Sequence, residues 1–332
     1  METMIAVTGA SGHIGNVLIP LLIKEGFKVR ALVYQAGITF RSDRIEIVKG
    51  SLDDKHSLIE LVKECEIVIH CAAHISIKSR KDPEVYRTNV EGTRNIFDTA
   101  LESGVKKFIH LSSIHAFDQL TKDEVLNEGT PYCKDNAPLY DISKRDAEKY
   151  VLENTSGRME VIVLNPTSVV GPYDNKPSLM GKALMDIYMR KVPMLIRGGF
   201  DFCDVRDVAL GVLNAIKNGR SGQKYLLSGN WHSLKEIQDY IIDLRGNSKK
   251  LAVMPPWVAW LGLPFIKIWS FLIKRDPLYT RESIKSLVYG HKNIRSEKAA
   301  KELGYSCRPF RETLTDTIKW FRENDYLNYK EQ

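Results

Sequence analysis

Thr8-Gly9-Ala10-Ser11-Gly12-His13-Ile14-Gly15 is the stretch that decides the fold of this 332-residue chain. The apolar run Met4–Thr8 leads into it, and a helical pattern follows it. Glycines spaced three apart allow a tight turn and let backbone N–H groups approach a phosphate at a helix N-terminus. Because strand, loop and helix follow in this order, the stretch predicts a dinucleotide-binding loop rather than a turn without a ligand.

Short apolar runs alternate with helical patterns through the first half of the chain. Each run is rich in Val and Ile and almost continuously apolar, which is typical of parallel strands buried on both faces. The predicted strands are Met4–Thr8, Lys28–Val33, 45–48, Ile67–His70, Lys107–Leu111 and 161–164. One helical stripe consists of Tyr86, Val90, Thr93, Phe97 and Leu101. The pattern predicts an α/β fold with a Rossmann-type, doubly wound parallel sheet.

The pattern changes near residue 172, where Gly171-Pro172 and Pro177 mark turns. We therefore predict a nucleotide-binding domain at 1–172 and a smaller, mostly helical substrate region at 173–332. Residues of about 194–230 are expected to return to the sheet through a strand near 224–227. The helices predicted after the turns lie near 179–188, 233–244, 280–289, 296–303 and 311–324.

Composition excludes several other classes of protein. The net charge is +7, without a Lys/Arg-rich run or a nucleic-acid-binding motif, so a nucleic-acid partner is not expected. Five widely spaced cysteines without a C-x-x-C pair predict neither a disulfide framework nor a zinc site. The chain starts without a basic and then apolar leader, so a reducing, cytoplasmic location is expected.

The end of the second predicted strand bears on the choice of cofactor. It reads Val33-Tyr34-Gln35, with no Asp or Glu to bind a ribose 2′-hydroxyl. A carboxylate there would repel a 2′-phosphate, and Arg41 and Arg44 lie just downstream. We expect NADP(H) to be preferred over NAD(H), the alternative being that both arginines are ordinary solvated side chains.

Tyr140-Asp141-Ile142-Ser143-Lys144 places a phenol and an ammonium group four residues apart, on one face of a helix. The nearby positive charge favours the phenolate, so the tyrosine can exchange a proton with a substrate oxygen. Ser113 follows the fifth predicted strand, at the edge where such sheets bind ligands, and is preferred over Ser112 as a partner of that oxygen. Asn89 is expected to support this site.

Together these residues resemble the extended short-chain dehydrogenase/reductase family over nearly the whole chain. The motifs that carry the resemblance are TGASGHIG at 8–15, HCAAH at 70–74, NVEGTRN at 89–95, LSS at 111–113, YDISK at 140–144, NPTSVVGP at 165–172 and DVRDVALGVLNAI at 204–216. Dihydroflavonol-reductase-like and 3β-hydroxysteroid-dehydrogenase-like members are the most similar.

The resemblance implies that Ser113, Tyr140 and Lys144 form a catalytic triad, with Asn89 as a fourth member. The cofactor contacts that it implies are Gly9, Ser11, Gly12, His13, Ile14, Gly15, Tyr34, Arg41, Ser51, Leu52, Ala72, Ala73, Tyr140, Lys144, Asn165, Pro166 and Val169. Tyr34 stands where the reductases often carry Arg, and Ser51 stands where the family usually has Asp. Phe200 replaces the Arg that sugar-nucleotide enzymes of this family use for a substrate pyrophosphate.

An apolar stretch at 251–275 contains Trp257, Trp260 and Trp269. It is long enough for a membrane span, but the prolines at 255, 256 and 264 and the charge of Lys267 argue against one. Two interpretations stay open, a peripheral contact with a membrane surface and a lid or dimer contact in the substrate region. All of these suit a moderately apolar small-molecule substrate, and a homodimer is common in the resembled family.

Three functional hypotheses follow from the sequence. The first is an NAD(P)-dependent oxidoreductase that interconverts a carbonyl and an alcohol by hydride transfer. The second is a sugar epimerase or dehydratase that retains its NAD. The third, a cofactor-sensing regulator without activity, conflicts with the presence of both Tyr140 and Lys144.

Overall fold

The computed structural model begins with the strand, glycine loop and helix that the sequence predicts. Strand β1 (Met4–Thr8) leads into helix α1 (His13–Lys24), which β2 (Lys28–Val33) follows. Ile5 and Val7 are buried against one layer of helices, and Ala6 against the other. The structure describes residues 2–34, 41–76, 82–119, 124–155, 157–246, 249–263 and 280–327.

A seven-stranded parallel sheet is the centre of the described part of the chain, with the strand order β10-β6-β5-β4-β1-β2-β3. The remaining strands are β3 (Ile45–Lys49), β4 (Ile67–His70), β5 (Lys107–Leu111), β6 (Glu160–Pro166) and β10 (Gln223–Leu227). The order reverses between β1 and β4, which is the point where doubly wound sheets bind ligands. The predicted fold class is therefore confirmed.

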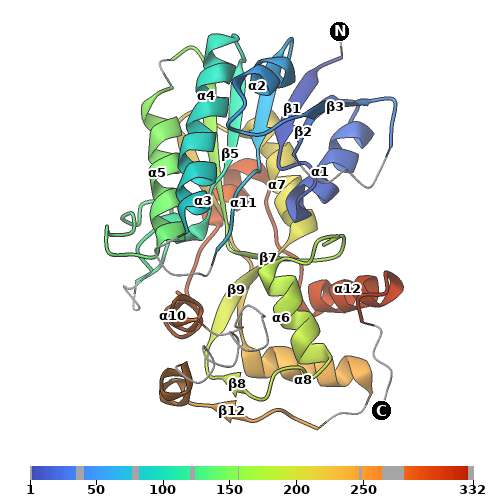
Figure 1. Ribbon diagram of the computed structural model, residues 1–332, viewed down its shortest axis with the longest axis vertical. Helices are drawn as coiled ribbons and strands as arrows, with labels where there is room; N and C mark the ends of the chain where they lie inside the picture. Colours follow the sequence, from blue (N-terminus) through green and yellow to red (C-terminus); the bar gives the residue numbers. More distant parts are fainter. Residues whose placement is uncertain are drawn as a thin grey trace.

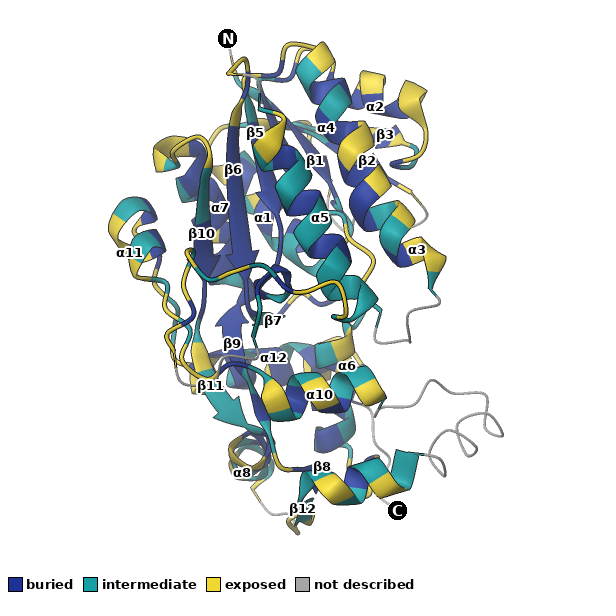
Figure 2. Cartoon of the chain, turned by 90° about the vertical axis from the view of Figure 1, so that its left-hand side faces the viewer, coloured by how far each residue is buried: buried dark blue, intermediate teal, exposed yellow. Residues whose placement is uncertain are grey.

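Helices cover both faces of this sheet (Figure 1). One face packs on α1, α7 (Val205–Asn218) and α11 (Glu297–Leu303). The other face packs on α2 (Lys55–Val62), α4 (Gly92–Glu102) and α5 (Leu139–Glu153). Figure 2 shows the result, with buried strands between helices that expose only their outer sides.

The stripe predicted from Tyr86 to Leu101 is helical but not uniform. It consists of α3 (Pro83–Tyr86), the π-helical turn η1 (Arg87–Glu91) and α4. Such π-turns insert an extra residue into a helix and are frequent at functional sites. Asn89 lies in this turn.

The second part of the chain lies below the large sheet in Figure 1. Its helices are α6 (Leu179–Tyr188), α8 (Leu234–Arg245), α10 (Arg281–Tyr289) and α12 (Phe310–Glu323). Two small sheets join them, one of β7 (Ser168–Val170), β9 (Gly199–Asp204) and β11 (Asn230–Ser233), the other of β8 (Leu195–Ile196) and β12 (Val253–Met254). Phe202 and Phe310 stack in its core with ring centres 4.7 Å apart. The chain segment 194–230 returns to the large sheet through β10. It also contains β8 and β9 of the small sheets and helix α7.

The predicted apolar stretch at 251–275 is described only as far as residue 263, and its remainder lies outside the described residues. A helix at 256–263 exposes Trp257 and Leu261, whose relative exposures are 62% and 67%. Among the described helices, none has both the length and the apolar character to cross a bilayer.

Gly229 connects β10 to β11 where the backbone of β9 passes closest. A Cβ atom on Gly229 would lie 1.6 Å from the carbonyl oxygen of Phe202. We expect Gly229→Ala to lower the free energy of unfolding by about 1–3 kcal/mol, because two backbone segments must separate. Urea unfolding measures this. Gly129→Ala is the matched control and should change stability by less than about 0.5 kcal/mol, since its Cβ would meet only the Asn127 side chain. Equal stabilities of the two variants would contradict the prediction.

Candidate active site

The glycine loop brings β1, β4 and α1 close together. Gly9 has a φ of +70°, and a Cβ on it would lie 2.6 Å from the backbone nitrogen of Ala72. A Cβ on Gly15 would lie 2.4 Å from the carbonyl oxygen of Gly9. Gly12 caps α1 without a side-chain hydrogen bond, so the first N–H groups of the helix are left for an anion. The loop therefore fits the pyrophosphate of a dinucleotide.

The non-glycine residues of the loop are partly buried, and one of them contacts the second part of the chain. Ser11, His13 and Ile14 are half-buried. The Nε2 atom of His13 lies 3.0 Å from the carbonyl oxygen of Pro172, so this ring links the loop to the start of the second part of the chain. The side chain of Asn16 donates to the carbonyl oxygen of Tyr173 at 3.5 Å.

A buried polar chain runs from the loop towards η1. The Thr8 hydroxyl lies 2.7 Å from Nδ1 of His70, and Nε2 of His70 lies 2.9 Å from the Thr93 hydroxyl. Thr93 in turn donates to the carbonyl oxygen of Asn89 at 2.6 Å. Burial lowers the pKa of His70 to about 3, so the ring is neutral. Sequence reasoning missed the role of His70, because its partners come from β1 and α4.

The residues predicted at the adenosine end follow β2 and β3, at the same edge of the sheet. Tyr34 and Arg41 are exposed, and residues 35–40 between them lie outside the described part. Ser51 is half-buried, and buried Leu52 accepts a hydrogen bond from Asn95 through its carbonyl oxygen at 2.9 Å. Arg44 donates to Glu2 at 2.9 Å and to the carbonyl oxygen of Gly26 at 3.1 Å. Of the two arginines, Arg41 is thus the one without a described partner.

Tyr140 and Lys144 occupy the first turns of α5, opposite the end of β5. Burial and the charge of Asp141 raise the pKa of the Tyr140 phenol, and the nearby Ser113 side chain opposes this effect. The Ser113 oxygen accepts the backbone N–H of His115 at 3.2 Å. The structure therefore brings the predicted serine and tyrosine together.

Lys144 is buried and donates to the carbonyl oxygen of Leu111 at 2.9 Å. Burial lowers the pKa of its ammonium group to about 8, and the charge of Glu148 opposes this effect. Glu148 lies one helical turn beyond Lys144 on the same face of α5.

Glu148 is the most important residue that sequence reasoning missed. It is fully buried and accepts hydrogen bonds from Ser112 and Asn165, both at 2.6 Å, and from Tyr132 at 3.1 Å. Burial raises the pKa of its carboxyl group. Because Ser112 is used here, Ser113 is the serine left for a substrate, as the sequence preferred. In the sequence, the one feature that could have identified Glu148 is its i, i+4 spacing from Lys144.

Both the oxygen and the nitrogen of the Asn89 side-chain amide form hydrogen bonds within the protein. Its oxygen accepts the backbone N–H of His74 at 2.7 Å, and its nitrogen donates to the carbonyl oxygen of His74 and to Ser143, both at 3.0 Å. The segment after β4, which contains Ala72 and Ala73, is thereby fixed to α5. This geometry gives Asn89 a supporting position.

The end of β6 closes the other side of the site. Asn165 donates to the carbonyl oxygen of Ser113 at 3.2 Å as well as to Glu148. Pro166 is the last residue of β6, and Val169 lies in β7, paired with Cys203 of β9. These residues stand beside the strand ends where the nicotinamide end of a dinucleotide is predicted.

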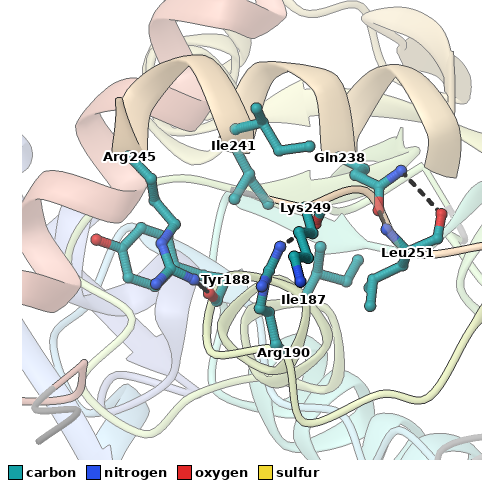
Figure 3. A pocket seen from close by; sticks show the side chains of 9 residues that line it. Ile187, Tyr188, Arg190, Gln238, Ile241, Arg245, Lys249 and Leu251 are labelled. Carbon is teal, nitrogen blue, oxygen red and sulfur yellow. Dashed lines mark hydrogen bonds between the residues drawn. The ribbon is translucent and has the colours of Figure 1, made fainter. Parts of the chain in front are cut away.

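A separate hollow between α6 and α8 does not belong to this site (Figure 3). Its cavity volume is about 10 Å³, near the lower limit for one water molecule. Arg190 and Arg245 lie across it and donate to the carbonyl oxygens of Lys249 and Tyr188. The hollow is therefore too small for a cofactor or a substrate.

Comparisons with known proteins agree with this geometry. Residues 5–228 match the model of the NAD dependent epimerase/dehydratase family. The chain is 30% identical to "Sterol demethylase protein B" of Methylococcus capsulatus, covering 97% of this chain and 99% of that protein. It is 28% identical to "Sterol-4-alpha-carboxylate 3-dehydrogenase, decarboxylating" of Dictyostelium discoideum, covering 90% and 95%.

A solved structure of similar length has a similar fold. The crystal structure of gox2253 superposes with a TM-score of 0.82 at 30% identity, covering 98% of this chain and 99% of that one. The family resemblance read from the motifs is confirmed. The chain belongs to the NAD dependent epimerase/dehydratase family and is an oxidoreductase of that family.

Proposed function

We propose that this enzyme interconverts a carbonyl and an alcohol on a small, moderately apolar substrate, with NADP(H) preferred over NAD(H). The observation that carries the proposal is that α5 places Tyr140 near Ser113 and joins buried Lys144 to the carbonyl oxygen of Leu111, at the end of β5. The bound nicotinamide cofactor supplies or accepts the hydride. The protein's own groups handle the proton and the substrate oxygen.

Each residue of the triad has a distinct role in this proposal. The phenol of Tyr140 donates a proton to the carbonyl oxygen during reduction and accepts it during oxidation. Ser113 donates to the same oxygen and holds it near Tyr140. Lys144, one helical turn away, is assigned the role of lowering the cost of a phenolate with its positive charge. Burial and the charge of Asp141 raise the pKa of Tyr140 in this place.

The surroundings of Asp201 support a substrate other than a nucleotide sugar. Asp201 is buried and accepts the backbone N–H of Gly229 at 2.8 Å, and Phe200 before it packs on Phe202. Nearby Arg206 is paired with Asp204 and Asp316, and Arg308 with Asp207. A substrate pyrophosphate would lack a free arginine among these described residues. The names of the two sterol-related relatives also favour an apolar substrate class.

The first experiment measures nucleotide content and cofactor affinity. Purified protein should arrive empty, bind NADPH more tightly than NADH and consume NADPH with a carbonyl panel. Protein loaded with NAD that consumes no added cofactor would favour the second candidate, a cofactor-retaining epimerase or dehydratase, and would contradict the proposal. That candidate is considered because the matching family model is named for epimerases and dehydratases.

Tyr140→Phe tests the proton transfer. We expect turnover to fall by about 10²–10⁴-fold, while the affinity for the cofactor changes by less than about twofold, because the ring that packs in the site is kept. Tyr240→Phe on α8 is the matched control and should retain wild-type turnover. Wild-type turnover in Tyr140→Phe would remove Tyr140 from the reaction.

Arg41→Ala tests the cofactor preference. We expect the ratio of NADPH to NADH affinity to fall by about tenfold, the value of one charge-assisted contact with phosphate. Arg44→Ala should leave the ratio unchanged, because Arg44 is held by Glu2 and Gly26. An unchanged ratio in Arg41→Ala would show that this side chain does not read the 2′-phosphate.

The pH dependence of kcat/KM tests the role of Lys144. Its pKa of about 8 means that the ammonium charge is lost as the pH rises through that value, so kcat/KM should fall on the alkaline side. Glu148→Gln removes the negative charge that opposes this loss, and the alkaline limb should move to lower pH. The matched control is Glu153→Gln, also on α5. A limb at the same pH in Glu148→Gln and in wild type would contradict the assignment.

A further inference from the structure

The helix at 256–263 is apolar on both of its sides. On the inner side, Ala259 is buried and Trp260 packs against the same core of the second part of the chain. On the outer side, Trp257 and Leu261 are exposed, and their i, i+4 spacing places them on one face. A helix of a globular protein normally turns polar side chains towards water. An exposed apolar face of this kind marks a binding surface.

The sequence around this face contains nothing that would make it polar. Residues 251–263 include no charged, hydroxyl or amide side chain. Strand β12 within this segment pairs with β8, and the backbone N–H of Arg197 donates to the carbonyl oxygen of Met254 at 2.8 Å. The pairing places the segment 189–197 beside the segment that carries Trp257. Figure 1 shows β8 and β12 at the end of the molecule remote from α2.

The two paired segments, 189–197 and 249–263, carry basic side chains and no acidic one. The basic side chains are all exposed, and we call them the basic rim: Arg190, Lys191, Arg197, Lys249 and Lys250. Asp239 of α8 pairs with Lys250 at 2.7 Å and compensates one of these charges. An exposed apolar face therefore lies close to a surface with an excess of positive charge.

An anionic lipid surface matches both features. Trp and Leu side chains partition into the interface between headgroups and acyl chains, and Lys and Arg are attracted to acidic headgroups. A second copy of the chain matches less well. A two-fold contact through this face would bring the basic rim of one copy close to that of the other, and like charges repel.

We propose that the end of the molecule formed by the 256–263 helix and the β8–β12 pair binds the surface of a membrane that contains acidic lipids. Trp257 and Leu261 enter the interface, and the basic rim lies over the headgroups. The inference goes beyond the proposed reaction and does not depend on it, because none of these residues belongs to the triad or to the glycine loop.

Sedimentation with lipid vesicles tests the proposal. The full chain is mixed with vesicles of pure phosphatidylcholine, or with vesicles in which about one third of the lipid is phosphatidylglycerol. We expect the partition coefficient to be at least about tenfold higher for the acidic vesicles, and the difference to shrink as the salt concentration rises. Equal partitioning into both kinds of vesicle, or binding to neither, would overturn the proposal.

A double variant tests the apolar face. Trp257→Ser with Leu261→Ser should lower binding to the acidic vesicles by at least about tenfold, because less apolar surface leaves water. Ile59→Ser with Leu210→Ser, at exposed positions of α2 and α7, is the matched control and should bind like wild type. Thermal melting checks that both double variants are folded. Wild-type binding by folded Trp257→Ser, Leu261→Ser protein would refute the assignment.

Charge reversal tests the basic rim. Lys191→Glu with Lys249→Glu should lower binding to the acidic vesicles by at least about tenfold. Lys55→Glu with Lys106→Glu changes the net charge equally at two exposed positions of the first part and should have little effect. An equal loss in both pairs would mean that net charge, and not this surface, controls binding, and would contradict the proposal.

Two further measurements separate the alternatives. Wild type and the Trp257→Ser, Leu261→Ser variant should have the same mass in sedimentation equilibrium. A wild-type dimer that dissociates in this variant would assign the face to a second copy and overturn the proposal. Tyr140→Phe should bind vesicles like wild type, so a failure of the proposed reaction leaves the membrane result unchanged, and the reverse also holds.

Discussion

A buried carboxylate, Glu148, is the interaction on which the geometry of the active site depends. Burying a charge costs several kcal/mol unless hydrogen bonds and an opposite charge compensate it. Here Ser112 from the end of β5, Asn165 from the end of β6 and Tyr132 all donate to it, and Lys224 of β10 lies 3.9 Å away. Three neighbouring strands are thereby fixed to α5, the helix that carries Tyr140 and Lys144.

The two parts of the chain meet at the glycine loop and the start of α1. His13 and Asn16 of α1 contact the carbonyl oxygens of Pro172 and Tyr173, where the chain leaves the first part. A molecule held at this loop therefore lies against both parts. The proposed reaction needs this arrangement, because the cofactor comes from one side and an apolar substrate from the other.

The sequence predicted the large sheet because its strands carry their own signal. Met4–Thr8 is apolar throughout and ends in the glycine loop, and Tyr140 and Lys144 share one helix face by spacing alone. The short strands β7, β9 and β11 were missed because their burial arises only when Ser168–Val170 meets Gly199–Asp204. Glu148 and His70 were missed for the same reason, since their partners lie far away in sequence or on another element.

The polar chain from β1 to α5 has a direction. Ala72 donates its N–H to Thr8, and because Thr93 donates to the Asn89 carbonyl, its oxygen accepts from Nε2 of His70, which leaves Nδ1 to accept from Thr8. Beyond it, the Asn89 amide donates to Ser143, which donates to the carbonyl oxygen of Tyr140. All donors point the same way, and neighbouring bonds of this kind polarise one another. The backbone at Tyr140 is thus anchored by aligned dipoles that begin at the glycine loop. Passing a proton along them would require every hydroxyl and the imidazole to reorient, so the chain acts as a brace and not as a proton wire.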